Sequence, residues 1–131
     1  MSTPLPNSVR VLAPAKINLH LRVGPPTAAD GFHPLSSWMV TVGLFDNLEF
    51  IRVTPPGIVL HCDDPAIPAD ASNLVVKAAR ALLDETGHER LGLRIELRKC
   101  IPAGAGLGGG SADGAFTLLA LDRLLGLNWP A

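Results

Sequence analysis

A glycine-rich segment between two apolar, periodic segments constrains this chain more than any other feature. It runs from Pro102 to Asp113, and five of its twelve residues are glycine. Glycine adopts positive φ without steric cost and lets a ligand approach the backbone N–H groups closely. Successive N–H groups in such a loop, followed by the positive end of a helix dipole, bind anions. The segment therefore predicts a loop that binds phosphate groups, most naturally those of a polyphosphate.

Other interpretations of the glycine-rich segment fit less well. A flexible linker is disfavoured because the loop lies between two periodic segments and contains Pro102 and Leu107. The P-loop pattern ends in Gly-Lys-Ser/Thr, which is absent here. The dinucleotide-binding fingerprint expects a parallel βαβ unit with a distal acidic residue, and the sequence does not show this convincingly. A plain turn stays open as the alternative to phosphate binding.

Composition limits the class of protein. At 131 residues the chain is expected to form one domain. Its hydrophobic fraction of 47% and charged fraction of 18% favour a packed core over disorder. The net charge of −1 gives no basic excess for nucleic acid as a partner. No apolar stretch is long enough to span a membrane, and the first residues do not resemble a signal peptide.

Cysteines and histidines point to no metal site. Cys62 and Cys100 lie far apart and are expected to be buried free thiols, which favours a cytoplasmic protein. The four histidines are scattered, so no zinc-binding spacing is present.

Periodicity predicts strands followed by strand–helix alternation, which is typical of an α+β fold. Pro14 is expected to interrupt the first two strands, and Asp46-Asn47 to form a turn. Ser72 or Asn73 is expected to begin one helix that ends at Gly87, and Ser111 to cap another that ends near Gly126. The expected strands are 9–13, 16–23, 35–44, 48–53, 58–62 and 91–101.

Three segments together resemble one family. They are Pro14-Ala-Lys-Ile-Asn-Leu19, Asp30-Gly-Phe-His33 and the glycine-rich run from Ile101 to Ser111. The glycine-rich run alone resembles the phosphate loop of the superfamily of galactokinase, homoserine kinase, mevalonate kinase and phosphomevalonate kinase. All three in this order, with Asn73-Leu-Val-Val-Lys-Ala-Ala79, resemble the 4-diphosphocytidyl-2-C-methyl-D-erythritol kinases of the non-mevalonate isoprenoid pathway. The resemblance covers nearly the whole chain.

The resemblance implies a fold and an activity. The fold is an N-terminal domain like domain 2 of ribosomal protein S5, with a mixed sheet and helices on one face. The activity is transfer of the ATP γ-phosphate, with Mg²⁺, to the 2-hydroxyl of a cytidine-diphosphate-linked methylerythritol. This implies a small-molecule substrate, no nucleic-acid or membrane partner and a cytoplasmic location; the oligomeric state stays open.

The resemblance also implies that residues 1–131 are the N-terminal, ATP- and substrate-binding part of such a kinase. The family's catalytic aspartate lies in a Gly-Ala-Asp-Val-Pro segment that this sequence lacks. Asp30, Asp70 and Asp113 are not assigned to replace it. The 131-residue chain is therefore expected to be inactive alone.

Roles for individual residues follow from the same resemblance. Lys16 would be catalytic, and Asn18, two residues on and on the same strand face, would lie beside the substrate. Phe32 would stack on the cytosine and His33 would hydrogen-bond it. Ser111 is compatible with contact to phosphate. The residues implied to bind ATP are Pro102, Ala103, Gly104, Ala105, Gly106, Leu107, Gly108, Gly109, Gly110, Ser111 and Ala112.

Each role has a plain structural alternative. Lys16 could be a solvated lysine at a strand start, and Asn18 could make a cross-strand hydrogen bond. His33 could be a surface loop histidine, and Phe32 a core aromatic that closes its loop. The family commonly has tyrosine at the position of Phe32, and serine and alanine where Ala112 and Gly114 stand.

Two rival functions stay open: another kinase of the superfamily, and a nucleotide-binding module without catalysis. A third, a nucleic-acid-binding domain of the S5 type, is disfavoured because the sequence has no basic face and has a phosphate loop.

Overall fold

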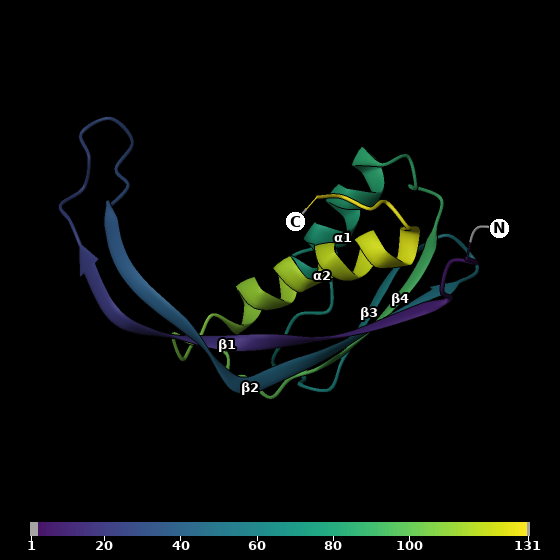
Figure 1. The fold of residues 1–131 in the computed structure, drawn as a ribbon, viewed down its shortest axis with the longest axis horizontal. Coiled ribbons are helices and arrows are strands. Elements are labelled where there is room, and N and C mark those ends of the chain that lie inside the picture. Colours follow the sequence, from purple (N-terminus) through teal and green to yellow (C-terminus); the bar gives the residue numbers. More distant parts are fainter. Residues whose placement is uncertain (1–2, 131) are drawn as a thin grey trace.

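The computed structural model describes residues 3–130 and has a mixed sheet covered on one face by two helices (Figure 1). The sheet order is β1-β2-β4-β3; β1 with β2 and β2 with β4 are antiparallel, whereas β3 and β4 are parallel. This confirms the expected α+β class. In chain order the elements are β1 (Ser8–Val23), β2 (Leu35–Val53), β3 (Gly57–Cys62), α1 (Leu74–Glu85), β4 (Gly92–Arg98) and α2 (Gly109–Leu125).

The first two strands are longer than expected, and two predictions about them were wrong. Pro14 does not end a strand, because the antiparallel ladder between β1 and β2 continues past it with register shifts between Pro14 and Lys16 and between Asn18 and His20. Such bulges absorb a residue that cannot donate to the ladder. Asp46 is likewise inside β2 and not in a turn. The distal halves of β1 and β2 leave the body of the sheet as an arm (Figure 1), closed by loop 24–34.

Three of the predicted helix ends agree with the structure. Asn73 caps α1, because its Oδ1 accepts a hydrogen bond from the Val75 N–H at 2.9 Å. Gly87, with φ of +73°, follows the end of α1, and Gly126, with φ of +65°, caps the C-terminus of α2.

The core between sheet and helices contains Leu48, Phe50, Leu93 and Ile95 from the sheet, Val75, Ala79 and Leu82 from α1, and Leu121 and Leu124 from α2.

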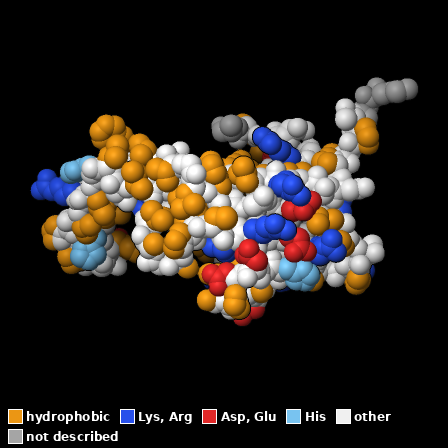
Figure 2. Space-filling view, turned by 90° about the horizontal axis from the view of Figure 1, so that it is seen from below, with side chains coloured by type: hydrophobic (Ala, Val, Ile, Leu, Met, Phe, Trp, Pro, Cys, Tyr) orange, Lys and Arg blue, Asp and Glu red, His pale blue; other side chains and the backbone are white. Residues whose placement is uncertain are grey.

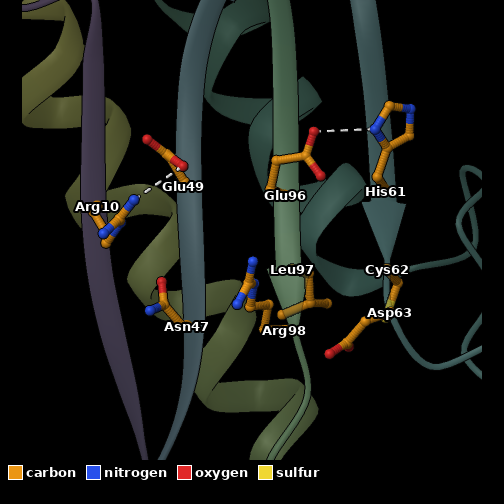
Figure 3. A pocket seen from close by; sticks show the side chains of 9 residues that line it. All are labelled: Arg10, Asn47, Glu49, His61, Cys62, Asp63, Glu96, Leu97 and Arg98. Carbon is orange, nitrogen blue, oxygen red and sulfur yellow. Dashed lines mark hydrogen bonds and ion pairs between the residues drawn. The ribbon is translucent and has the colours of Figure 1, made fainter.

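The other face of the sheet is polar. Figure 3 shows Arg10 beside Glu49 and His61 beside Glu96, with closest N–O distances of 3.3 and 3.1 Å. These residues and their neighbours line a shallow cavity of about 550 Å³.

No described helix is long and apolar enough to cross a membrane. Cys100 is exposed and Cys62 partly buried, so the prediction of two buried thiols was wrong for Cys100.

The arm carries much of the exposed apolar surface. Figure 2 shows hydrophobic side chains gathered over the arm end of the molecule and charged side chains over the opposite end. The exposed large apolar residues of the arm are Ile17, Leu19, Leu21, Val23, Phe32, Leu35, Trp38, Met39, Leu44 and Phe45.

Candidate phosphate-binding site

The glycine-rich loop leads directly into the N-terminus of α2. Gly104, Gly106 and Gly108 have φ of +71°, +74° and +70°, a region that other residues rarely adopt. Gly108 is the N-cap of α2 and offers no side chain to cap it. The prediction that Ser111 caps this helix was therefore wrong: the positive φ of Gly108 starts the helix three residues earlier.

The first turn of α2 presents free backbone donors. The Ala112 N–H donates to the Gly108 carbonyl at 2.9 Å, so the N–H groups of the three residues between them have no partner inside the helix. No acidic side chain lies in this turn to compete with an anion. The geometry suits a phosphate group at the helix N-terminus.

The loop borders a cavity of about 420 Å³. Its other walls are segment 67–74, which precedes α1, and the side chains of Lys99 and Asp113. The volume lies within the range of small-molecule sites. The residues from Pro102 to Ser111 that were implied to bind ATP therefore surround one cavity, whereas Ala112 is not part of its lining.

Lys16 lies against this loop. Its backbone N–H donates to the Leu107 carbonyl at 2.9 Å, and a Cβ added to Gly108 would come within 3.0 Å of Lys16 Cγ. Its ammonium donates to Asn18 Oδ1 at 2.7 Å. Lys16 is thus a partly buried lysine with a fixed neighbour, and a freely solvated side chain does not describe it.

Asn18 is held in turn by a residue that the sequence analysis did not identify. Asn18 Nδ2 donates to Ser37 Oγ at 2.7 Å, and the Ser37 hydroxyl donates to the His20 carbonyl at 3.1 Å. Ser37 lies on β2, so only the pairing of β1 with β2 brings it to Asn18. The cross-strand hydrogen bond considered for Asn18 is present, and the same side chain contacts Lys16 as well.

Phe32 and His33 lie at the far end of the arm, in loop 24–34. Phe32 is 75% exposed, so it does not close its loop as a core aromatic residue. His33 Nδ1 lies 2.8 Å from the Gly24 carbonyl oxygen, which only accepts, so Nδ1 carries the hydrogen. In the neutral ring, Nε2 is then an acceptor. Asp30 Oδ1 accepts from the Phe32 N–H at 3.0 Å and stabilises the turn.

The structure therefore brings some of the implied residues together and separates others. Lys16 and Asn18 meet at the glycine-rich loop, whereas Phe32 and His33 follow the end of β1. Val23 is the seventh residue after Lys16, a length along the strand on the order of 20 Å. A single ligand that contacts both places must be long.

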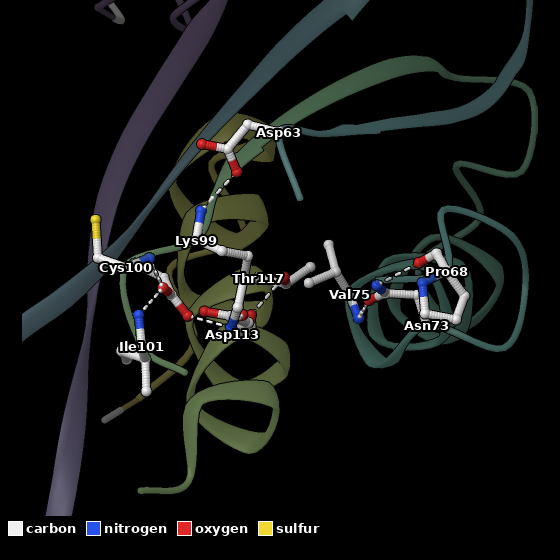
Figure 4. Close-up of polar contacts among 10 residues, drawn as sticks. Asp63, Pro68, Asn73, Val75, Lys99, Cys100, Ile101, Asp113 and Thr117 are labelled. Atoms are coloured by element: carbon white, nitrogen blue, oxygen red, sulfur yellow. Dashed lines mark hydrogen bonds and ion pairs between the residues drawn. The ribbon is translucent and has the colours of Figure 1, made fainter. Parts of the chain in front are cut away.

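A second cluster, which the sequence analysis did not identify, lies next to the two ends of the loop, and Figure 4 labels its Lys99 and Asp113 side chains. Lys99 Nζ donates to Asp46 Oδ2 and, at 3.0 Å, to Asp113 Oδ2. The three side chains come from β2, from the segment after β4 and from α2, and no spacing in the sequence connects them. The only available signal was the presence of charged residues within apolar surroundings.

Burial and pairing set the charges of this cluster. Burial would raise the pKa of Asp46, but hydrogen bonds from Ile101, Lys99 and Cys100 outweigh it and lower the pKa. Burial would lower the pKa of Lys99, but Asp46 and Asp113 raise it. Burial, with repulsion from Asp46, raises the pKa of Asp113 to about 7. Lys99 and Asp46 are thus ionised at neutral pH, and Asp113 titrates near it.

Comparisons with known proteins identify kinases that are similar to this chain. The pattern described as "GHMP kinases N terminal domain" matches residues 73–131. The 4-diphosphocytidyl-2-C-methyl-D-erythritol kinase of Prochlorococcus marinus is 48% identical over 92% of this chain and 38% of its own length. The kinase of that name from Protochlamydia amoebophila is 49% identical over 91% and 40%. The chain spans about two fifths of the length of these relatives.

Solved structures have a similar fold. A crystal structure of 4-(cytidine 5'-diphospho)-2C-methyl-D-erythritol kinase matches with a TM-score of 0.77 and 38% identity, over 93% of this chain and 42% of the other. Homoserine kinase from Cytophaga hutchinsonii, at 24% identity and a TM-score of 0.75 over 99% and 39%, shares the fold. The chain therefore resembles the GHMP kinases over residues 73–131, and it is similar to the 4-diphosphocytidyl-2-C-methyl-D-erythritol kinases over about two fifths of a member's length.

Proposed function

We propose that residues 1–131 form the N-terminal, ATP- and substrate-binding part of a cytoplasmic kinase that phosphorylates the 2-hydroxyl of 4-diphosphocytidyl-2-C-methyl-D-erythritol. The observation that carries this proposal is the position of Lys16. Its backbone hydrogen-bonds the glycine-rich loop and its side chain crosses Gly108 at the start of α2. A cationic side chain therefore lies against the loop whose N–H groups begin α2.

The chemistry of phosphoryl transfer fits these groups. Such transfer relies mainly on positioning and on stabilising charge that spreads over the phosphoryl oxygens. We assign the loop from Pro102 to Ala112 to the ATP phosphates, and the Lys16 ammonium to the charge near the transferred group. Asn18 orients that ammonium through its 2.7 Å hydrogen bond, and Ser37 keeps Asn18 in place.

The arm suits the other end of the substrate. The cytosine exocyclic amine is a donor, and Nε2 of His33 is an acceptor when Nδ1 donates to Gly24. The exposed ring of Phe32 offers a stacking face. A cytidine diphosphate joined to a polyol is an elongated molecule. Its base can therefore lie at the arm while its hydroxyl lies near Lys16.

Magnesium accompanies ATP in this proposal and neutralises phosphate charge when bound. The described residues contain no group of three His, Cys, Asp or Glu side chains placed to hold a metal ion. We therefore expect the ion to arrive with the phosphates of the nucleotide and not to occupy a separate protein site.

Catalysis needs more than these residues. A group that orients or deprotonates the attacking hydroxyl is expected in such a reaction, and we assign none of the described carboxylates to it. We propose that the remaining length of the relatives supplies it. An alternative function, a nucleotide-binding module without catalysis, then describes the 131-residue chain by itself.

A substrate panel tests the proposed function. In an enzyme of the relatives' full length that contains this chain, ADP release is measured with ATP, Mg²⁺ and one acceptor at a time: the cytidine-linked methylerythritol, mevalonate, homoserine or galactose. We expect turnover with the first alone, and its loss in Lys16→Ala. Turnover with another acceptor would assign the chain to a different kinase of the superfamily.

A further inference from the structure

The buried cluster of Lys99, Asp46 and Asp113 joins the two ends of the phosphate loop. Asp46 Oδ1 accepts hydrogen bonds from the Cys100 and Ile101 N–H groups, at 2.6 and 2.8 Å, immediately before the loop begins. Asp113 lies in α2, immediately after the loop ends. Lys99 donates to both carboxylates and so connects the entrance of the loop to its exit.

The start of α2 packs closely on this cluster. A Cβ added to Gly109 would lie 2.9 Å from Ile101 Cγ2 and 3.2 Å from Lys99 Nζ. The absence of a side chain at this position therefore lets the start of α2 lie close to Ile101 and the Lys99 ammonium. The side chains of Lys99, Asp46 and Asp113 are only 7%, 0% and 3% exposed, so solvent screens their interaction weakly.

Stability alone is a weak reason for this arrangement, because burying charges carries a desolvation penalty that well-packed apolar residues avoid. A glycine-rich loop has many conformations to lose when it binds a ligand. Fixing both of its ends in advance reduces the cost of ordering it on binding. One polar atom, Asp113 Oδ1, is left without a partner among the described residues, which is a further cost of holding the cluster together.

We propose that Lys99, Asp46 and Asp113 are positioning residues that set the spacing between the two ends of the phosphate loop and thereby its affinity for ATP. They act through the backbone of residues 100–101 and through the start of α2. The inference rests on the proposed function, since ATP is the ligand that reports it.

The test uses the full-length enzyme and two variants of the cluster. Asp113→Leu removes the acceptor for Lys99 at similar volume. Asp46→Asn keeps an oxygen that accepts from the Cys100 and Ile101 N–H groups. Its amide nitrogen replaces Oδ2 and cannot accept a hydrogen bond from Lys99, and the unchanged size of the side chain favours folding. For both we expect at least a fivefold rise in the Kd of ATP by calorimetry and in its KM. The KM of the cytidine-linked substrate should stay within twofold.

Two controls separate positioning from stability. Asp113→Asn retains an oxygen that accepts from Lys99, so it should restore ATP affinity to within twofold of the wild type. Leu82→Ala removes core packing in α1, away from the loop, and should lower Tm without changing the Kd of ATP.

The outcomes are distinguishable. If the Asp46→Asn and Asp113→Leu proteins fold and bind ATP with wild-type affinity, the positioning role is refuted. It is also refuted if the KM values of ATP and of the cytidine-linked substrate rise together, in proportion to the loss of Tm. A wild-type enzyme that does not bind ATP would instead refute the proposed function, and the inference with it.

Discussion

Replacing Gly108 with alanine should damage the site in two separable ways. The first is backbone strain, because φ of +70° costs a residue with a Cβ about 1–2 kcal/mol. The loop of the variant will relax away from this conformation, and ATP must restore it. If this whole strain energy opposes ATP binding, the Kd of ATP rises roughly 5- to 30-fold.

The second effect concerns Lys16. The new Cβ would lie 3.0 Å from Lys16 Cγ and 3.1 Å from Cε, so this side chain must move by a few tenths of an ångström. Misplacement of a catalytic group by about 1 Å can cost a hundredfold in rate. We therefore expect kcat to fall by roughly tenfold, beyond the loss of affinity.

Gly106→Ala is the matched control. Gly106 has φ of +74°, but nothing lies within 4 Å of an added Cβ. It should carry the strain without disturbing Lys16, so ATP affinity should fall while kcat at saturating ATP stays near the wild-type value. Steady-state kinetics and ATP calorimetry on the full-length enzyme measure both quantities. Equal kcat values for the two variants would refute the contact between Gly108 and Lys16, and unchanged ATP affinity in both would refute the assignment of the loop.

Four further predictions follow from the described contacts. His33→Ala should raise the KM of the cytidine-linked substrate at least fivefold and leave that of ATP unchanged in steady-state kinetics; a selective loss for ATP would reverse the assignment. Asn73→Ala removes the cap of α1 and should lower the free energy of unfolding by about 1 kcal/mol in urea denaturation; no change would contradict the cap. Because the pKa of Asp113 rises from 3.8 to about 7 on folding, the folded state retains a proton that the unfolded chain releases. Its free energy of unfolding should therefore fall by on the order of 3 kcal/mol between pH 4 and 7, and a similar slope in Asp113→Asn would exclude this residue as the cause. The 131-residue chain should release no substrate-dependent ADP, because nothing assigned in it orients the attacking hydroxyl; robust turnover lost in Lys16→Ala would show that it is self-sufficient.

Local sequence signals predicted the parts of this fold that depend on neighbours in the chain. Asn73 caps α1, and the glycines at 87 and 126 end the helices, because each acts through its own conformation or through a bond two residues away. The density of glycine before α2 predicted a loop with positive φ for the same reason. The roles of Lys16 and His33 came from a family resemblance and stay predictions.

Long-range pairing explains what the sequence did not predict. The β1–β2 ladder carries both strands past Pro14 and Asp46, where local propensity indicated a break and a turn. The cap assigned to Ser111 was wrong because Gly108, in contact with Lys16 of β1, already begins the helix. The contact of Ser37 with Asn18 and the cluster around Lys99 join residues from separate elements, so only the folded chain brings them together.

An ATP titration followed by amide NMR tests the central claim most directly. On ¹⁵N-labelled full-length enzyme, ATP with Mg²⁺ should shift the amide signals from Gly104 to Ser111, which line the proposed phosphate site, and that of Lys16, whose N–H donates to the Leu107 carbonyl of the loop. The signals of Arg10 and Arg98, which line the cavity on the polar face of the sheet (Figure 3), should not move. Shifts confined to that polar face, with the glycine-rich loop unchanged, would contradict the account.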